Sequence, residues 1–134
     1  MGTAVPVEVK LLVAAVIIGL VQIVWAATAA SGGERNFAWL AGPRDEPRPV
    51  GTLAGRLDRA LKNFLETFPL FVAALIACIA AGKLGTLSLY GAGLYVIARA
   101  LYVPLYASGV AVVRTLVWTA SLIGIVMVIV AFFR

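Results

Sequence analysis

The chain has no histidine and only one cysteine, Cys78, among its 134 residues. Histidine is the commonest metal ligand and the usual general base, so we expect no metal site and no imidazole catalysis. A single cysteine excludes a disulfide within the chain. Because Cys78 lies inside an apolar run, we expect it to behave as a small hydrophobic side chain.

Charged residues are also scarce. They make up 13% of the chain, whereas about a quarter of a typical soluble domain is charged, and 63% of the residues are hydrophobic. With a mean hydropathy of +1.04, the composition indicates a small integral membrane protein with a single domain over residues 1–134. The net charge is +5, but no basic stretch lies on a soluble module, so membrane lipids and not nucleic acid are the expected partners.

Four apolar stretches match the length of a membrane span, since about 20 helical residues cross a hydrocarbon core of about 30 Å. We expect helices over residues 7–30, 53–82, 86–107 and 110–133. The turns after the second and third helices are short, which predicts antiparallel neighbours. The fold class is therefore an all-α, up-and-down four-helix membrane bundle. The sequence "AATAASG" permits signal-peptide cleavage, but the apolar run before it exceeds the core of about 7–15 residues found in signal peptides.

The basic residues are concentrated at one end of these helices. The long loop 31–52 and the start of the second helix carry most of them, and Arg114 lies on the same side. The opposite side has only Lys10, Lys83 and Arg134. Because Lys and Arg collect in cytoplasmic loops, we expect the long loop to be cytoplasmic and both termini to lie on the opposite side.

Two stripes of polar side chains follow the second and third helices. The first has spacings of three, four and three, and comprises Arg56, Arg59, Asn63 and Glu66. The second has spacings of four, three and four, and comprises Tyr95, Arg99, Tyr102 and Tyr106. Each spacing places its set on one face of a helix. An arginine at the bilayer centre costs at least about 2.5–3.5 kcal/mol, so these faces should line the bundle interior, a subunit interface or a watery cavity.

Two interpretations of the stripes remain open from the residues alone. In the structural one, Glu66 pairs with Arg99, while Arg56 and Arg59 reach lipid phosphates. In the functional one, the surplus of cations and phenols over one glutamate binds an anionic ligand. Asn63 can donate and accept, and Glu66 can hold an ammonium group. A ligand with two carboxylates and one ammonium group satisfies this set.

Arg114, at the start of the fourth helix, also has two interpretations. It can anchor the helix on the cytoplasmic side. Alternatively, its guanidinium can lower the pKa of a nearby thiol, and the thiolate is the nucleophilic form. The sequence does not decide between them.

The stretch "RLDRALKNFLETFPLF", residues 56–71, resembles the signature of the MAPEG superfamily, the membrane-associated proteins in eicosanoid and glutathione metabolism. That signature is roughly R-x-x-R-A-x-x-N-x-x-E-x-F-P-L-F, and each of its fixed positions is matched. The stretch "ARALYVPLY", residues 98–106, is similar to the pattern A-R-x-x-Y-x-x-x-Y of the family's third helix. Four spans with a long first loop agree with the family along the whole chain.

The resemblance implies a homotrimer that binds glutathione, as co-substrate, between neighbouring subunits near the cytoplasmic membrane face. It implies a membrane-bound glutathione transferase, with peroxidase activity as a further expectation, acting on small lipophilic electrophiles. Arg114 and Tyr106 are the implied catalytic residues, which stabilise the thiolate. The implied glutathione contacts are Arg35 of the adjacent subunit, Arg56, Arg59, Asn63, Glu66, Arg99, Tyr102 and Tyr106.

Departures from the family pattern narrow the expected activity. Thr67 and Leu61 replace a tyrosine and a glutamine of leukotriene C4 synthase-like members, so we do not expect a dedicated leukotriene synthase. The chain resembles the bacterial branch, which implies a bacterial inner membrane. The alternative function is a non-catalytic lipid-binding scaffold of the same family. A proton-coupled drug exporter is disfavoured, because Glu8 precedes the first span and Glu66 is held ionised among arginines.

Overall fold

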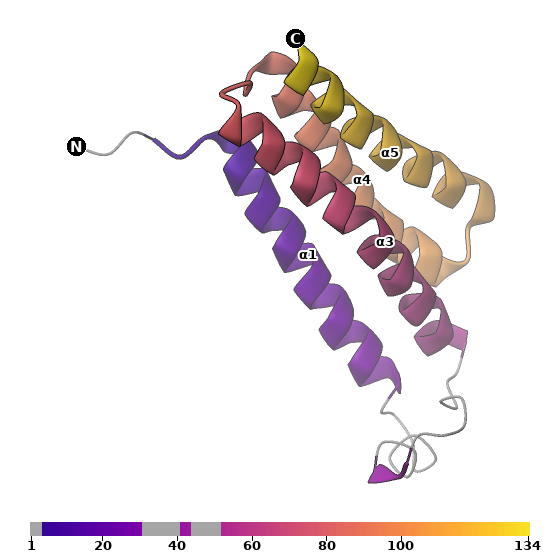
Figure 1. The fold of residues 1–134 in the computed structure, drawn as a ribbon. Coiled ribbons are helices and arrows are strands. Elements are labelled where there is room, and N and C mark those ends of the chain that lie inside the picture. The colour runs from indigo at the N-terminus through magenta and orange to yellow at the C-terminus, as the bar shows by residue number, and fades with distance from the viewer. Residues whose placement is uncertain (1–3, 31–40, 44–51) are drawn as a thin grey trace.

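The computed structural model describes residues 4–30, 41–43 and 52–134. Its long helices are α1 (Val7–Ala30), α3 (Thr52–Ala80), α4 (Thr86–Ser108) and α5 (Ala111–Phe133) (Figure 1). All four are long and apolar enough to cross a membrane. The predicted all-α four-helix membrane bundle is therefore confirmed, and the helix ends lie within two residues of the predicted positions.

The helices alternate in direction, so α1 and α4 run the same way, and the first described residues lie at the same end as the C-terminus (Figure 1). The α4–α5 contact is the most extensive, while α1 packs against both α3 and α4, and α3 also packs against α5. Near the start of α1 and α4, the Ser88 hydroxyl donates to Glu8 Oε1 at 3.3 Å. This bond fixes the register of the two parallel helices at that end.

The turn between α4 and α5 brings two predicted site residues together. Gly109 ends α4 with φ 82°, a left-handed conformation that glycine adopts without steric strain. Its N–H donates to the carbonyl oxygen of Tyr106 at 3.1 Å. Because α5 begins at Ala111, Arg114 lies in the first turns of that helix, beside the end of α4.

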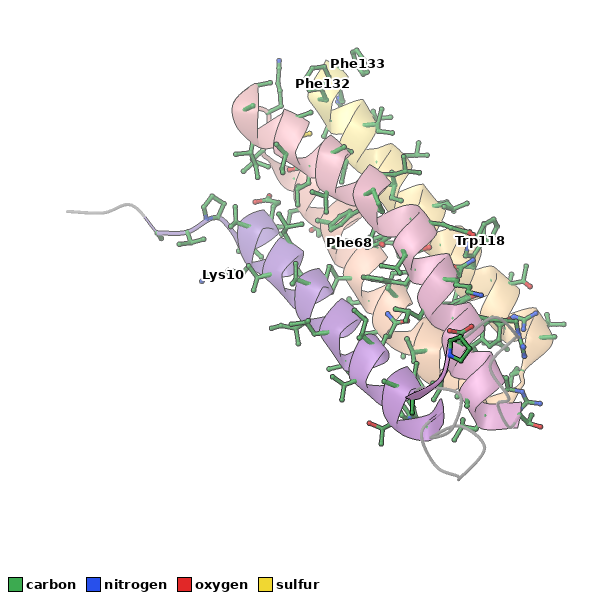
Figure 2. All side chains as sticks on the ribbon, turned by 60° about the horizontal axis from the view of Figure 1, so that its bottom comes forward. Lys10, Phe68, Trp118, Phe132 and Phe133 are labelled. Atoms are coloured by element: carbon green, nitrogen blue, oxygen red, sulfur yellow. The ribbon has the colours of Figure 1, made fainter. Side chains whose placement is uncertain are left out.

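An apolar core fills the space between the helices. The Phe71 and Tyr95 rings stack at its centre, with centroids 4.1 Å apart, and both side chains are fully buried. Phe68 packs against this core and points in among the helices, whereas Lys10 points away from the bundle (Figure 2). Many large apolar side chains, such as Leu70, remain exposed, as expected where lipid is the solvent.

The backbones of α4 and α5 approach most closely at Gly91 and Gly124. A Cβ atom on Gly124 would lie 2.6 Å from the Gly91 carbonyl oxygen and 2.8 Å from the Tyr95 nitrogen. Both neighbours are backbone atoms, which cannot rotate away. We expect Gly124→Ala to separate the helices and to lower the free energy of unfolding by about 1–3 kcal/mol, measured by thermal unfolding in detergent.

Gly93→Ala is the matched control for Gly124→Ala. Gly93 lies on α4, and a Cβ atom there would meet nothing within 4 Å. We expect this variant to unfold at or slightly above the wild-type Tm, because alanine favours the helix. Equal Tm values for the two variants would contradict the close α4–α5 contact.

Candidate functional site

A cavity of about 330 Å³ opens between α3, α4 and α5, at the end of the bundle that carries the α4–α5 turn. Small-molecule sites typically enclose about 300–1,000 Å³. The side chains that line it come from both polar stripes and from the start of α5: Arg59, Asn63, Tyr102, Tyr106, Arg114, Thr115 and Trp118. Five of these seven residues are among those that the sequence patterns singled out.

Tyr106 lies between two guanidinium groups of this cavity. Arg59 Nε donates a hydrogen bond to the Tyr106 hydroxyl oxygen at 3.1 Å. The guanidinium carbon of Arg114 lies 4.6 Å from the centroid of the Tyr106 ring. Because the hydroxyl oxygen accepts from Arg59, its own hydrogen remains available for a ligand in the cavity. The arrangement concentrates positive charge around one phenol whose hydroxyl hydrogen is free to bond a ligand.

Arg99 lies behind the cavity wall and is fully buried. Its Nη1 donates to Asn63 Oδ1 at 2.9 Å, and its guanidinium carbon lies 4.2 Å from the Tyr102 ring centroid. A guanidinium has only donors, so it holds the oxygen of the Asn63 amide toward itself and leaves the amide NH₂ group for the cavity. Arg99 therefore supports two lining residues without lining the cavity itself.

Glu66 is exposed and does not line the cavity, although it lies close enough to Tyr102 to interact with it electrostatically. The ion pair between Glu66 and Arg99 that the structural interpretation required is not formed, since the partner of Arg99 is Asn63. Arg35, the implied contact from an adjacent subunit, lies outside the described residues.

Arg56 is directed toward the end of α4 and not toward the cavity. Its Nη1 donates to the Ala107 carbonyl oxygen at 3.1 Å, and its guanidinium lies over Gly109. A cation at a helix C-terminus satisfies a free carbonyl group and interacts favourably with the helix dipole.

Because of this contact, we expect Arg56→Ala to act on stability. The variant loses a charged hydrogen bond that is worth about 1.5–3 kcal/mol, so its Tm in detergent should fall. Ligand affinity, measured at a temperature where the variant is folded, should change by less than about twofold. A large loss of affinity with an unchanged Tm would contradict this role.

A second cavity of about 390 Å³ lies at the opposite end of the bundle. The turn between α3 and α4 and the end of α5 form its walls, and Lys83 Nζ there donates to the Arg134 carbonyl oxygen at 3.2 Å. Among the described residues, no aromatic side chain and no amide side chain lines it. The first cavity, which collects both polar stripes, is therefore the candidate site.

The model of the MAPEG family matches residues 11–134, which is nearly the whole chain. The chain belongs to the MAPEG family. The resemblance that the two motifs carry is thereby confirmed at the level of the family. Neither the curated proteins nor the solved structures contain a match to the chain.

In this MAPEG protein, the cavity includes two α5 residues that the sequence patterns did not indicate, Thr115 and Trp118. Trp118 follows Arg114 by one helical turn and therefore shares its face. The half-buried indole projects from α5 (Figure 2) and adds an apolar surface to the lining of the site. The spacing from Arg114 was the available signal. It was hidden because most residues of α5 are apolar, so a tryptophan does not stand out among them.

Proposed function

We propose that this MAPEG protein is a membrane-bound glutathione transferase, with peroxidase activity toward lipophilic hydroperoxides. The cavity carries the proposal. It presents two arginines, one asparagine amide and two phenols, and no carboxylate of the described residues lines it. Such a surplus of donors suits an anionic ligand with many hydrogen-bond acceptors. Glutathione has two carboxylates, one ammonium group and a thiol, and the volume of the cavity suits a ligand of that size.

The binding roles follow from what each side chain presents. The Arg59 guanidinium and the Asn63 NH₂ group are donors for the glutathione carboxylates. Tyr102 can donate to the peptide carbonyl oxygens. Glu66 is exposed and close to Tyr102, and its carboxylate would bind the ammonium group of glutathione.

The catalytic roles fall to Arg114 and Tyr106. A guanidinium beside the glutathione thiol, such as that of Arg114, lowers the pKa of the thiol. Each pKa unit of this decrease corresponds to about 1.4 kcal/mol of stabilisation of the thiolate relative to the thiol. The Tyr106 hydroxyl, whose oxygen already accepts from Arg59, donates its hydrogen to the sulfur. The thiolate then forms a bond to an electrophilic carbon, and the leaving group departs with the bonding electron pair. Trp118 offers apolar surface to an electrophile that enters from the bilayer.

The proposal includes a homotrimer. Arg59 and Glu66 are exposed on α3 beside apolar side chains such as Leu70. Exposure of these charges to lipid is costly, so burial against a second copy is the favourable arrangement. We place the long loop, and with it the site, on the cytoplasmic side of a bacterial inner membrane, because the basic residues gather there.

Glutathione binding to the purified protein tests the proposal. Addition of glutathione should produce the short-wavelength ultraviolet absorbance of a thiolate, and isothermal titration should show saturable binding that yields a Kd. Binding of S-methyl glutathione, which cannot ionise at sulfur, should give heat but no thiolate absorbance. Absence of binding by a well-folded oligomer would eliminate the transferase and would leave the lipid-binding scaffold as the function to test.

A further inference from the structure

Gln22 of α1 is a buried amide without a hydrogen-bond partner. Its side chain is 2% exposed, and neither Oε1 nor Nε2 has a partner among the described residues. Arg99 is in the same condition, because Nε and Nη2 have no partner there although Nη1 is bonded to Asn63. An unsatisfied buried polar group destabilises the folded state, and an unsatisfied charged group does so more strongly. The Trp118 indole nitrogen is the third such group among the described residues, but that side chain lines the first cavity. Gln22 and Arg99 line neither cavity, so they call for a common explanation.

The packing of α1 against α4 indicates a similar level in the bundle for Gln22 and Arg99. The two helices run in the same direction, and Ala26 and Val103 belong to one apolar cluster. Gln22 lies four residues before Ala26, and Arg99 lies four residues before Val103. One turn back along parallel helices is the same displacement, so the two side chains should lie at similar depth.

Phe64 of α3 connects the same two positions independently. Its ring is in close contact with Gly19 of α1, where a Cβ atom would lie 3.0 Å from it. The guanidinium carbon of Arg99 lies 5.7 Å from the centroid of the same ring. Gln22 follows Gly19 by three residues and shares its buried face. Both routes indicate that Gln22 and Arg99 face the same part of the interior, between α1, α3 and α4.

We propose that Gln22 and Arg99 bind one buried water molecule between them. A buried water needs about two to four polar partners, and these two side chains offer four free atoms. The water oxygen accepts from Arg99 Nε or Nη2, and a water hydrogen is donated to Gln22 Oε1. Gln22 is then a positioning residue. It holds Arg99, which in turn orients the Asn63 amide and packs on Tyr102.

The order of two Tm values tests the water site without any ligand. Gln22→Leu removes the acceptor but keeps the approximate shape, so we expect the Tm in detergent to fall by roughly 3–6 °C. Gln22→Glu supplies a carboxylate to the same water and guanidinium, so we expect it to retain the wild-type Tm or exceed it. If Gln22 had no link to Arg99, the order would be reversed. Gln22→Leu would then raise the Tm, because it removes an unpaired buried amide. Gln22→Glu would lower the Tm, because it buries an uncompensated charge.

A double-mutant cycle tests the coupling directly. In an Arg99→Met background, Gln22→Leu should produce no further loss of Tm, because the water has already lost its other partner. Additive losses would overturn the proposal. If Arg99→Met does not fold, a high-resolution density map of the wild-type protein replaces the cycle. An ordered water between the two side chains would support the site, and its absence would overturn it.

The effect on ligand binding rests on the proposed function and has its own readout. Gln22→Leu should weaken glutathione binding by about 3–10-fold, because the Asn63 amide is no longer held, and Gln22→Glu should restore it. The thiolate absorbance per bound glutathione should stay unchanged, since Arg114 and Tyr106 are not altered. Wild-type affinity in Gln22→Leu would overturn the positioning role. If the wild-type protein binds no glutathione, the proposed function fails while the Tm order still decides the water site.

Discussion

Arg114→Ala is expected to abolish the thiolate absorbance of bound glutathione and to lower kcat for conjugation by about 10²–10³-fold, as for loss of one charge-stabilising donor in an active site. The guanidinium of Arg114 lines the cavity and lies 4.6 Å from the Tyr106 ring centroid. Without it, the developing negative charge on sulfur has only a phenol beside it. The Kd for glutathione should change little, because the carboxylate-binding groups remain. Absorbance titration and steady-state kinetics measure the two quantities.

Arg134→Ala is the control for charge. Arg134 lies at the opposite end of α5 from Arg114 and does not line the first cavity. We expect this variant to keep wild-type kcat and thiolate absorbance, and Arg114→Lys to recover part of both because it keeps the charge without the planar group. An unchanged thiolate signal in Arg114→Ala would show that another group activates the sulfur.

Arg59→Ala is expected to weaken glutathione binding by about 10–100-fold, which corresponds to the loss of a charged hydrogen bond of about 1.5–3 kcal/mol. Arg59 lines the cavity and also donates to the Tyr106 hydroxyl, so the variant frees that phenol as well. We therefore expect a smaller accompanying fall in kcat. Isothermal titration gives the affinity, and separate values of kcat and KM distinguish the loss of binding from the loss of turnover.

Lys62→Ala provides a control on the same helix with the same change of charge. Lys62 is exposed, forms an ion pair with Asp58 at 3.4 Å and does not line the cavity. Such surface pairs contribute about 0–1 kcal/mol, so the Kd for glutathione should stay within about twofold of wild type. Equal losses in the two variants would indicate general attraction of an anion, and the direct contact assigned to Arg59 would then be wrong.

Hydropathy and turn residues were sufficient to predict the fold. Four apolar runs of spanning length leave few alternatives, because the bilayer requires every backbone group of a span to be bonded within it. The ends of α4 were predictable to within one residue, since Gly109 closes it in the left-handed conformation. The helical period also placed the stripe residues on common faces, and half of them, two from each stripe, meet at one cavity.

The period of a helix does not determine which neighbour each side chain meets. Arg56 and Arg59 lie on one predicted stripe, yet the first bonds the end of α4 and the second reaches Tyr106. Long flexible side chains on one face can reach several partners, and the choice depends on the rotation and spacing of the adjacent helices. The place of Trp118 in the cavity wall depends on the packing of α5 in the same way.

By itself, the sequence determined that this protein has four membrane-spanning helices, which of its polar residues share a helix face, and its family. These properties are local, since they follow from hydropathy, periodicity and motif. Only the tertiary structure decided that Arg99 is buried behind Asn63 and not paired with Glu66, and that α5 completes the cavity. Those outcomes depend on contacts between residues far apart in the chain, where packing selects one hydrogen-bond partner from several that the composition allows.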